Sequence, residues 1–264
     1  MCHKTITTWP TVSREAVAAI LPSIKCGAYG FNRLLTIGGN PKTDKSDKGG
    51  VWLSAILHLT PGFLCMWATR GCLRGCLHTA GNRVYWKGKK RARKARTDLF
   101  LDKPEVFVAL LVYELRLFVA KCKKLGLRPC VRLNGTSDVP WERVCPWLFQ
   151  EFKGVRFYDY TKGVHRLGFT PRNYHLTLSR SETNGAIVDM MLERGFHVAV
   201  VIRDAKHNRP KYWRGWRTED GDKDDLLFLR KHPVQVLYPK GRAKSDRSGW
   251  VIDQLVQAHH KWSK

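Results

Sequence analysis

The sequence predicts an α/β protein with a mostly parallel sheet, either an open sheet or a partial (β/α) barrel. Short runs of aliphatic and β-branched residues recur along the second half of the chain, and amphipathic or turn-rich segments separate them. Strands that alternate with helices favour parallel pairing through right-handed crossovers. Because no linker divides these elements, residues 51–264 are expected to form one domain, preceded by an N-terminal extension at residues 1–50.

The first third of the chain predicts three elements. A short helix is expected over Ser13–Leu21. The segment Gly38–Gly50 is rich in Gly, Lys and Asp, which predicts an exposed loop. Val51–Leu59 is apolar and lies between Gly-Gly and Thr-Pro-Gly, so it predicts a buried strand.

The longest expected helix begins at Asp102, where Asp102 and Glu105 form a D-x-x-E capping box and Pro104 occupies the first turn. This helix is expected to stop at Gly126. A second amphipathic segment covers Ala186–Arg194. Five further strands are expected, and they are Cys130–Asn134, Val155–Tyr160, Tyr174–Leu178, His197–Ile202 and Val234–Tyr238.

Three cysteines follow the expected buried strand with the spacing C-x6-C-x3-C: Cys65, Cys72 and Cys76. Interspersed glycines let a backbone wrap closely around a metal centre, and thiolates are soft ligands that suit iron–sulfur clusters or zinc. A [4Fe-4S] cluster held by three cysteines leaves one iron open, whereas zinc would take His58 or His78 as a fourth ligand. Buried thiols without a metal are the remaining alternative. The other five cysteines are dispersed and are expected to be buried or incidental thiols.

The start of the chain lacks an apolar signal-peptide core, and the longest apolar run, Val106–Ala120, contains Glu114 and Arg116. We therefore expect an intracellular protein with no membrane partner. A reducing compartment disfavours disulfides, which supports a chemical role for clustered cysteines.

The formal net charge of +25 predicts an anionic partner. The segment 81–97 contains cations with no acid, together with Tyr85 and Trp86. Aromatic residues also accompany the basic segment 207–217, and a third basic segment covers 240–247. These features predict nucleic-acid binding, without distinguishing DNA from RNA. The nucleic-acid-binding candidates are Arg83, Lys87, Lys89, Lys90, Arg91, Arg93, Lys94 and Arg96.

Polar residues follow three successive expected strands. The carboxyl ends of parallel strands meet at one edge of a sheet, so these residues are candidates for a common cofactor pocket. Hydroxyl groups suit an amino or carboxylate group, and cations suit an anion. Ordinary helix capping is the alternative role. The cofactor-binding candidates are Asn134, Gly135, Thr136, Ser137, Asp138, Tyr160, Lys162, Ser179 and Arg180.

The buried strand, the three cysteines and the following β/α units resemble radical S-adenosylmethionine (radical SAM) enzymes. That resemblance implies a [4Fe-4S] cluster on the three cysteines, S-adenosylmethionine on the open iron and a β/α barrel. The segments CMWATRGCLRGCLHTAG, VRLNGTSD and VRFYDYTK resemble more closely a family of bacteriophage gene products, over about residues 35–250. This second resemblance implies a phage-encoded protein in the cytoplasm of its host.

Three functions follow from these features. The first is a radical-SAM-like iron–sulfur enzyme that acts on, or is bound to, nucleic acid. The second is a non-catalytic nucleic-acid-binding protein that an iron–sulfur or zinc site stabilises. The third is a magnesium-dependent nuclease that uses carboxylates such as Asp138, Asp159 and Asp222. For the acidic segment 220–225 we expect a helix start capped by Asp222 instead of a calcium loop.

Overall fold

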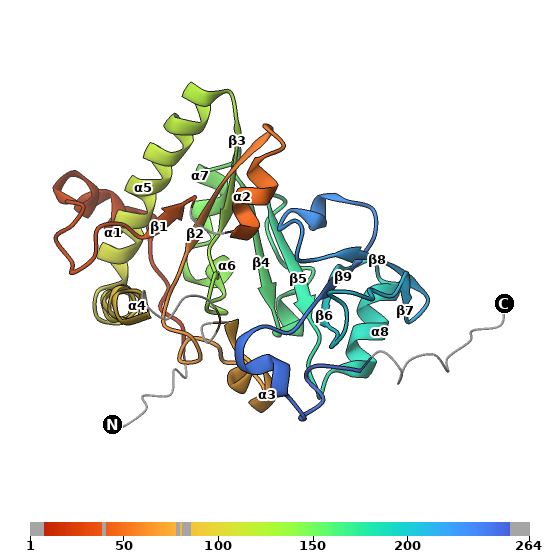
Figure 1. Ribbon diagram of the computed structural model, residues 1–264. Helices are drawn as coiled ribbons and strands as arrows, with labels where there is room; N and C mark the ends of the chain where they lie inside the picture. The colour runs from red at the N-terminus through yellow and green to blue at the C-terminus, as the bar shows by residue number, and fades with distance from the viewer. Residues whose placement is uncertain (1–7, 39–40, 78–79, 81–85, 254–264) are drawn as a thin grey trace. The chain divides into compact units, whose positions relative to one another are not determined.

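The computed structural model describes residues 8–38, 41–77, 80 and 86–253, and it shows an α/β protein with a nine-stranded, mostly parallel sheet (Figure 1). The strands are β1 (Leu35–Ile37), β2 (Trp52–Leu57), β3 (Arg128–Arg132), β4 (Arg156–Thr161), β5 (Tyr174–Ser179), β6 (Val198–Val201), β7 (Tyr212–Trp213), β8 (Trp216–Asp220) and β9 (Val234–Leu237). Their order in the sheet is β1-β2-β3-β4-β5-β6-β9-β8-β7. The predicted α/β class and mostly parallel sheet are confirmed, whereas a barrel of the radical SAM type stays a prediction.

The chain divides into two compact units. Unit 1 contains Met1–Met66, Asn82–Asp159 and Phe169–His175, and unit 2 contains Trp67–Gly81, Tyr160–Gly168 and Leu176–Lys264. The N-terminal residues expected to be an extension thus contribute helix α1 (Arg14–Ile20) and strand β1 to unit 1.

Strand β2 lies between β1 and β3 and confirms the predicted buried strand at residues 51–59. Its residues from Ser54 to Leu57 are buried. It pairs in parallel with β3, with Ala55 opposite Val131, and antiparallel with β1, with Ile37 opposite Ala55. The three-residue strand β1 is too short for its alternation to be read from the sequence.

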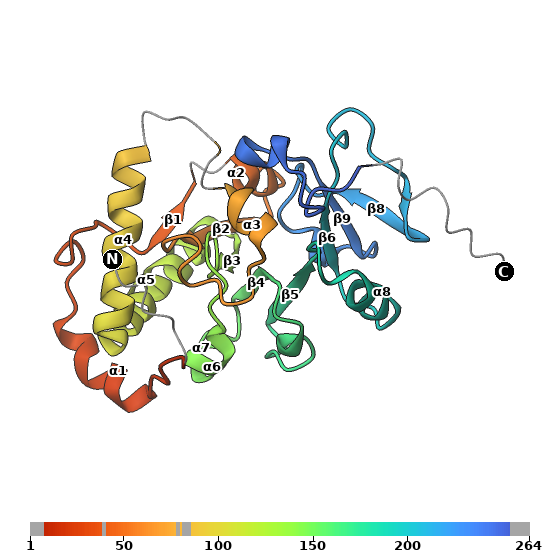
Figure 2. The same ribbon diagram turned by 90° about the horizontal axis from the view of Figure 1, so that it is seen from below.

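Two long helices of unit 1 follow one another, α4 (Trp86–Asp102) and α5 (Pro104–Leu125), and they contact each other (Figure 2). Helix α5 confirms the predicted helix and its predicted end, where Gly126 has a φ of 68°, a left-handed conformation that glycine adopts without strain. The predicted capping box is wrong. Asp102 is the last residue of α4, and Lys103, the N-cap of α5, makes no side-chain capping hydrogen bond.

The segment Gly38–Gly50, which the sequence predicts to be a loop, contains helix α2 (Pro41–Asp47), so that prediction is wrong. The turn-forming composition is overridden by contacts with β2. The Asp47 carboxylate accepts hydrogen bonds from Ser54 N at 3.1 Å and from Ser54 Oγ at 2.7 Å, and Thr43 is buried. The predicted N-terminal helix is confirmed, with Ser13 accepting a hydrogen bond from Ala16 N.

An aromatic and aliphatic core fills unit 1. Phe107 of α5 packs edge-on against Phe100 of α4, with ring centroids 5.2 Å apart, and stacks on Trp141 of the short helix α6 (Trp141–Val144). The neighbouring helix α7 covers Trp147–Glu151. Glu114 is buried beside this core, where burial raises its pKa while its oxygens accept the backbone N–H groups of residues 34 and 35.

In unit 2, β9 lies between β6 and β8 and pairs in parallel with both. Helix α8 (Gly185–Glu193) lies against β6 (Figure 2). The predicted strands at 174–178, 197–202 and 234–238 and the predicted helix at 186–194 are confirmed. Short helices complete the unit: α3 (Arg70–Arg74) and the 3-10 helices η4 (Val164–Arg166), η5 (Leu227–Leu229) and η6 (Gly241–Ser245).

The basic segment 207–217 contains an antiparallel hairpin, β7–β8, that the local sequence pattern does not predict. Trp213 pairs with Trp216, and the two residues between them, Arg214 and Gly215, have φ values of 50° and 81°. Positive φ at both central positions is the geometry of a two-residue type I′ turn. The sequence feature that indicates this turn is the Arg-Gly pair between two tryptophans.

Candidate functional site

Residues 86–97 of the predicted nucleic-acid-binding segment form the first part of helix α4, and residues 81–85 lie outside the described residues. Cations outnumber acids along α4, because its first turn contains no acid, and Lys94 forms an ion pair with Asp98 at 2.7 Å. Trp86 at its start is 37% exposed. Arg83 lies outside the described residues. The exposed cations of the helix are Lys87, Lys89, Lys90, Arg91 and Lys94.

Arg96 differs from the other cations because it points into unit 1. Its Nε and Nη2 donate to the Arg33 carbonyl at 2.9 and 2.6 Å, and its guanidinium lies 5.5 Å from the centre of the Phe31 ring. Burial lowers the pKa of Arg96. Arg96 therefore fixes α4 to the segment before β1.

His58 follows β2 beneath this cationic helix, and Arg96 Nη1 lies 3.4 Å from its carbonyl oxygen. Burial, followed by the positive fields of Arg93, Arg132 and Arg96, lowers the pKa of His58 to about 3. The role of His58 as a zinc ligand stays a prediction. The other predicted fourth ligand, His78, lies outside the described residues.

The loop after β3, residues 134–138, is held by hydrogen bonds within unit 1. Asn134 Oδ1 accepts from Ser137 Oγ at 2.8 Å and from Val139 N at 2.9 Å. The buried Asp159 carboxylate accepts from Asn134 N at 2.6 Å and from Tyr174 Oη at 2.8 Å. These contacts order the loop, so Asp159 serves as an internal acceptor in this unit.

The neighbouring loop residues have packing roles as well. Thr136 Oγ1 donates to the Leu59 carbonyl at 2.6 Å, and Asp138 is buried. A Cβ on Gly135 would lie 2.6 Å from His58 Nδ1, so only glycine fits there. Ligand binding by the 134–138 loop stays a prediction.

The predicted cofactor-binding residues of unit 2 also make internal contacts. Tyr160 Oη donates to Gln235 Oε1 at 2.9 Å. Arg180 Nη1 donates to the carbonyls of residues 249 and 250. The Ser179 carbonyl accepts from Asn184 Nδ2 at 3.1 Å, and Lys162 is half-buried. Their assignment to a cofactor pocket stays a prediction.

The three clustered cysteines are partly exposed and form no disulfide, whereas Cys122, Cys130 and Cys145 are buried. Cys65 belongs to unit 1, where its Sγ lies 4.0 Å from the Thr136 carbonyl oxygen, and Cys72 and Cys76 belong to unit 2. Within the part of the chain that the structure describes, no group of three or more His, Cys, Asp or Glu side chains is placed to hold a metal ion. The three-cysteine metal site therefore stays a prediction.

Helix α3, which carries Cys72, is anchored by Glu182. The Glu182 carboxylate accepts from Thr69 Oγ1 and from Gly71 N, both at 2.7 Å. Burial opposes ionisation of Glu182, but these hydrogen bonds outweigh it and lower its pKa. Glu182 is thus a capping residue for α3.

The glycines of the three-cysteine segment have a packing explanation. A Cβ on Gly71 would lie 2.3 Å from Ser248 Oγ, and a Cβ on Gly75 would lie 2.4 Å from Trp250 Cζ3. Close contact with the segment 243–250 therefore requires glycine at both positions. These packing contacts explain both glycines without a metal centre for the chain to wrap.

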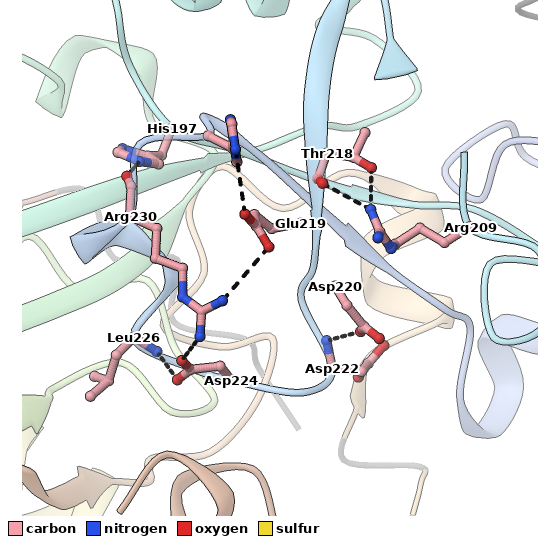
Figure 3. Close-up of polar contacts among 10 residues, drawn as sticks. His197, Arg209, Thr218, Glu219, Asp220, Asp222, Asp224, Leu226 and Arg230 are labelled. Carbon is pink, nitrogen blue, oxygen red and sulfur yellow. Dashed lines mark hydrogen bonds and ion pairs between the residues drawn. The ribbon is translucent and has the colours of Figure 1, made fainter. Parts of the chain in front are cut away.

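The acidic segment 220–225 binds its own loop (Figure 3). Asp220 Oδ1 accepts from Asp222 N at 3.0 Å, and Asp224 Oδ1 accepts from Leu226 N at 2.8 Å while Asp224 Oδ2 pairs with Arg230. The following 3-10 helix η5 has Leu226 at its N-cap and no side-chain capping hydrogen bond, so the predicted cap by Asp222 is wrong. Asp222, mostly buried, instead accepts from the backbone N of residue 238.

None of the helices in the described ranges is both long and apolar enough to cross a membrane. The fold and the cationic helix together define an α/β protein with an exposed basic face. A family model described as Gene product 88 matches residues 32–254, and the chain belongs to that family. This membership agrees with the resemblance to phage gene products. Neither the curated proteins nor the solved structures give a match, so the radical SAM resemblance stays a prediction.

Proposed function

We propose that this chain binds nucleic acid through the exposed cationic face of α4. The observation that supports the proposal is the arrangement of the cations: Lys87, Lys89 and Lys90 lie in the first turns of the helix, with no acid in the first turn to offset them. Cations near a helix N-terminus oppose the helix dipole, and like charges four residues apart, such as Lys87 and Arg91, repel each other. A polyanion removes both penalties.

Nucleic acid is the polyanion that best fits the surroundings of these charges. Phosphate groups along a strand can contact successive lysines and arginines, and release of condensed counterions drives such binding. The partly exposed Trp86 ring at the start of the helix offers a surface on which a base can stack. The function is therefore electrostatic binding of a nucleic-acid backbone.

Salt dependence tests this function. The triple variant Lys89→Ala/Lys90→Ala/Arg91→Ala should bind a fluorescent 20-mer more weakly, and the slope of log K against log salt should fall by about 0.9 for each duplex DNA phosphate that the variant no longer neutralises. Fluorescence anisotropy between low and physiological salt measures the slope, with duplex DNA and single-stranded RNA compared in parallel.

The matched control removes three exposed lysines from the end of α5 in the same unit: Lys121, Lys123 and Lys124. This control has the same change in net charge, so its slope should stay close to that of the unchanged protein. Equal slopes in the two triple variants would mean that binding follows overall charge, and the assignment to α4 would be wrong.

A second candidate adds a metal centre on Cys65, Cys72 and Cys76. The observation in its favour is that these three residues are partly exposed, while Cys122, Cys130 and Cys145 are buried. When bound, a [4Fe-4S] cluster with an open iron would supply one-electron chemistry on S-adenosylmethionine, as the radical SAM resemblance implies. The chain's own contribution would be the thiolate ligands.

Metal analysis tests the second candidate. Protein purified without oxygen should contain iron and acid-labile sulfide, or zinc, and the content should fall in Cys72→Ser but not in Cys26→Ser, which changes an exposed cysteine outside the cluster. Electron paramagnetic resonance with and without S-adenosylmethionine then examines the open iron. A protein without metal under these conditions would end this candidate and leave nucleic-acid binding by α4 untouched.

A further inference from the structure

Unit 2 contains a cavity of about 690 Å³ that neither α4 nor the three-cysteine segment accounts for. Ligand cavities in proteins commonly have volumes of about 300–1,000 Å³, so this one is large enough for a nucleotide-sized molecule. Two loops form most of its wall, residues 203–207 and 238–244, which follow β6 and β9. Its basic and aromatic side chains are Arg203, Lys206, His207, Tyr238, Lys240 and Lys244.

The position of the cavity in the sheet is one at which α/β proteins bind ligands. β6 and β9 pair in parallel up to Val201 opposite Leu237, so both loops leave the same carboxyl edge. The chain passes from β6 to β8 and only then returns to place β9 between them. Where the strand order reverses in this way, the loops that follow the two neighbouring strands diverge. A crevice is left between these loops, beyond the carboxyl ends of the strands.

Two of the cations are part of the wall. Arg203 donates from Nη1 to the Lys244 carbonyl at 2.9 Å and from Nη2 to the Asp246 carbonyl at 2.8 Å, which fixes one loop against the other. Lys240 pairs with the mostly buried Asp222, and Asp222 also accepts from Tyr238 N at 2.9 Å. The cavity is therefore built by specific contacts.

Other cations remain available to a ligand. Lys206, His207 and Lys244 are exposed and, among the described residues, make no ion pair. One acid, Asp204, lines the same cavity. The excess of positive charge favours an anion in the cavity and disfavours a ligand of net positive charge.

One aromatic ring also belongs to this cavity lining. Tyr238 is half-buried, and the Lys240 ammonium lies 4.6 Å from its ring centre. The hydrogen bond from Tyr238 N to the Asp222 carboxylate fixes the backbone at this residue and so restricts the position of the ring. A planar ring beside several cations is the combination that recognises a base or sugar together with a phosphate.

We propose that this cavity binds a phosphorylated ligand of nucleotide size, with its phosphate on Lys206 and Lys244 and its planar part against Tyr238. The proposal goes beyond backbone binding by α4, because it concerns a separate cavity whose residues all belong to unit 2. The ligand is a nucleoside phosphate, either free in solution or as the 5′-phosphate end of a strand.

Calorimetry on the full chain tests the ligand class. Adenosine 5′-diphosphate should bind at least about tenfold more tightly than adenosine, because each charged hydrogen bond to phosphate contributes about that factor or more. S-adenosylmethionine carries the same nucleoside without phosphate and with a net positive charge, so it should bind weakly. Inorganic phosphate alone should bind more weakly than the diphosphate. Equal affinity for adenosine and its diphosphate would overturn the proposal.

Variants test the location. Lys206→Ala/Lys244→Ala should weaken diphosphate binding by about tenfold or more, and Tyr238→Leu should weaken binding of the diphosphate but not of inorganic phosphate. Lys231→Ala, an exposed lysine just before β9, is the control and should change affinity less than about twofold. Similar losses in the control and the double variant would overturn the assignment to this cavity.

Two further comparisons separate the ligand sources and the two sites. The first compares a 5′-phosphorylated oligonucleotide with its unphosphorylated counterpart. If the phosphorylated strand binds better, and only when Lys206 and Lys244 are present, the ligand is a strand end. If the two strands bind equally well, the ligand is a free nucleotide. The α4 triple variant should keep its affinity for the diphosphate. If this variant keeps its affinity for the diphosphate and its oligonucleotide salt slope equals that of the unchanged protein, the proposal of backbone binding by α4 is wrong while the cavity proposal holds.

Discussion

Replacing His58 by Asn should remove a large pH dependence of stability. The pKa of this imidazole is lowered from 6.5 to about 3 in the folded protein, whereas the unfolded chain takes up a proton near pH 6.5. The unfolded state therefore binds more protons between these values, so stability is complete above pH 6.5 and falls as the pH decreases. For these two pKa values the folded state loses up to about 1.9 kcal/mol between pH 7 and pH 5.

The assay is urea unfolding at pH 7, 6 and 5, with the free energy of unfolding extrapolated to water. His58→Asn has its own packing cost, because Gly135 lies against the ring, but that cost is the same at each pH and does not affect the difference. His207→Asn, at an exposed histidine, is the control. If His58→Asn loses as much stability between pH 7 and pH 5 as the unchanged protein, or if the His58 resonance titrates near pH 6.5, the reasoning is refuted.

Three other substitutions test the packing and hydrogen-bond assignments. Gly75→Ala should cost about 1–3 kcal/mol in urea unfolding, since its Cβ would meet Trp250, whereas Gly154→Ala, with open space around it, should cost less. Glu182→Gln should flatten the loss of thermal stability below pH 4.5, because a carboxyl whose pKa is lowered on folding stabilises the protein above its ordinary value and loses that effect in acid; an unchanged acid profile would contradict its capping role. Asp159→Asn should cost about 2–4 kcal/mol, since an amide nitrogen would face donors that now bind a carboxylate; a neutral effect would show that the network is dispensable.

Local sequence patterns predict most of the parallel strands because those strands are buried. Runs such as those of β2, β6 and β9 are mostly apolar and have buried residues on both faces, and turn-forming residues bound them clearly. Helix α5 is equally predictable, since its apolar residues recur with helical spacing and Gly126 ends it. The capping motif misplaces the start of α5, because a second helix runs directly up to Lys103 and a capping motif alone does not exclude that arrangement.

Elements that depend on contacts outside their own segment are not predictable in this way. Helix α2 consists of turn-forming residues, and the hydrogen bonds that its Asp47 accepts from Ser54 of β2 do not follow from the composition of the segment. The role of Arg96 is a similar case. Its place in a run of cations predicts a solvent-facing charge, yet the Arg33 carbonyl group, more than 60 residues earlier in the chain, holds it.

The three-cysteine segment shows how one set of residues supports two physical explanations. Glycines between potential metal ligands are expected if the chain must wrap a cluster, but Gly71 and Gly75 are equally required by contacts with residues 248 and 250. Glu182, two residues after Arg180, secures the same segment by accepting the Gly71 N–H group. Since packing alone accounts for the glycines, they carry no information about a metal. The case for a metal centre therefore depends on the thiols themselves, and metal content is the measurement that decides it.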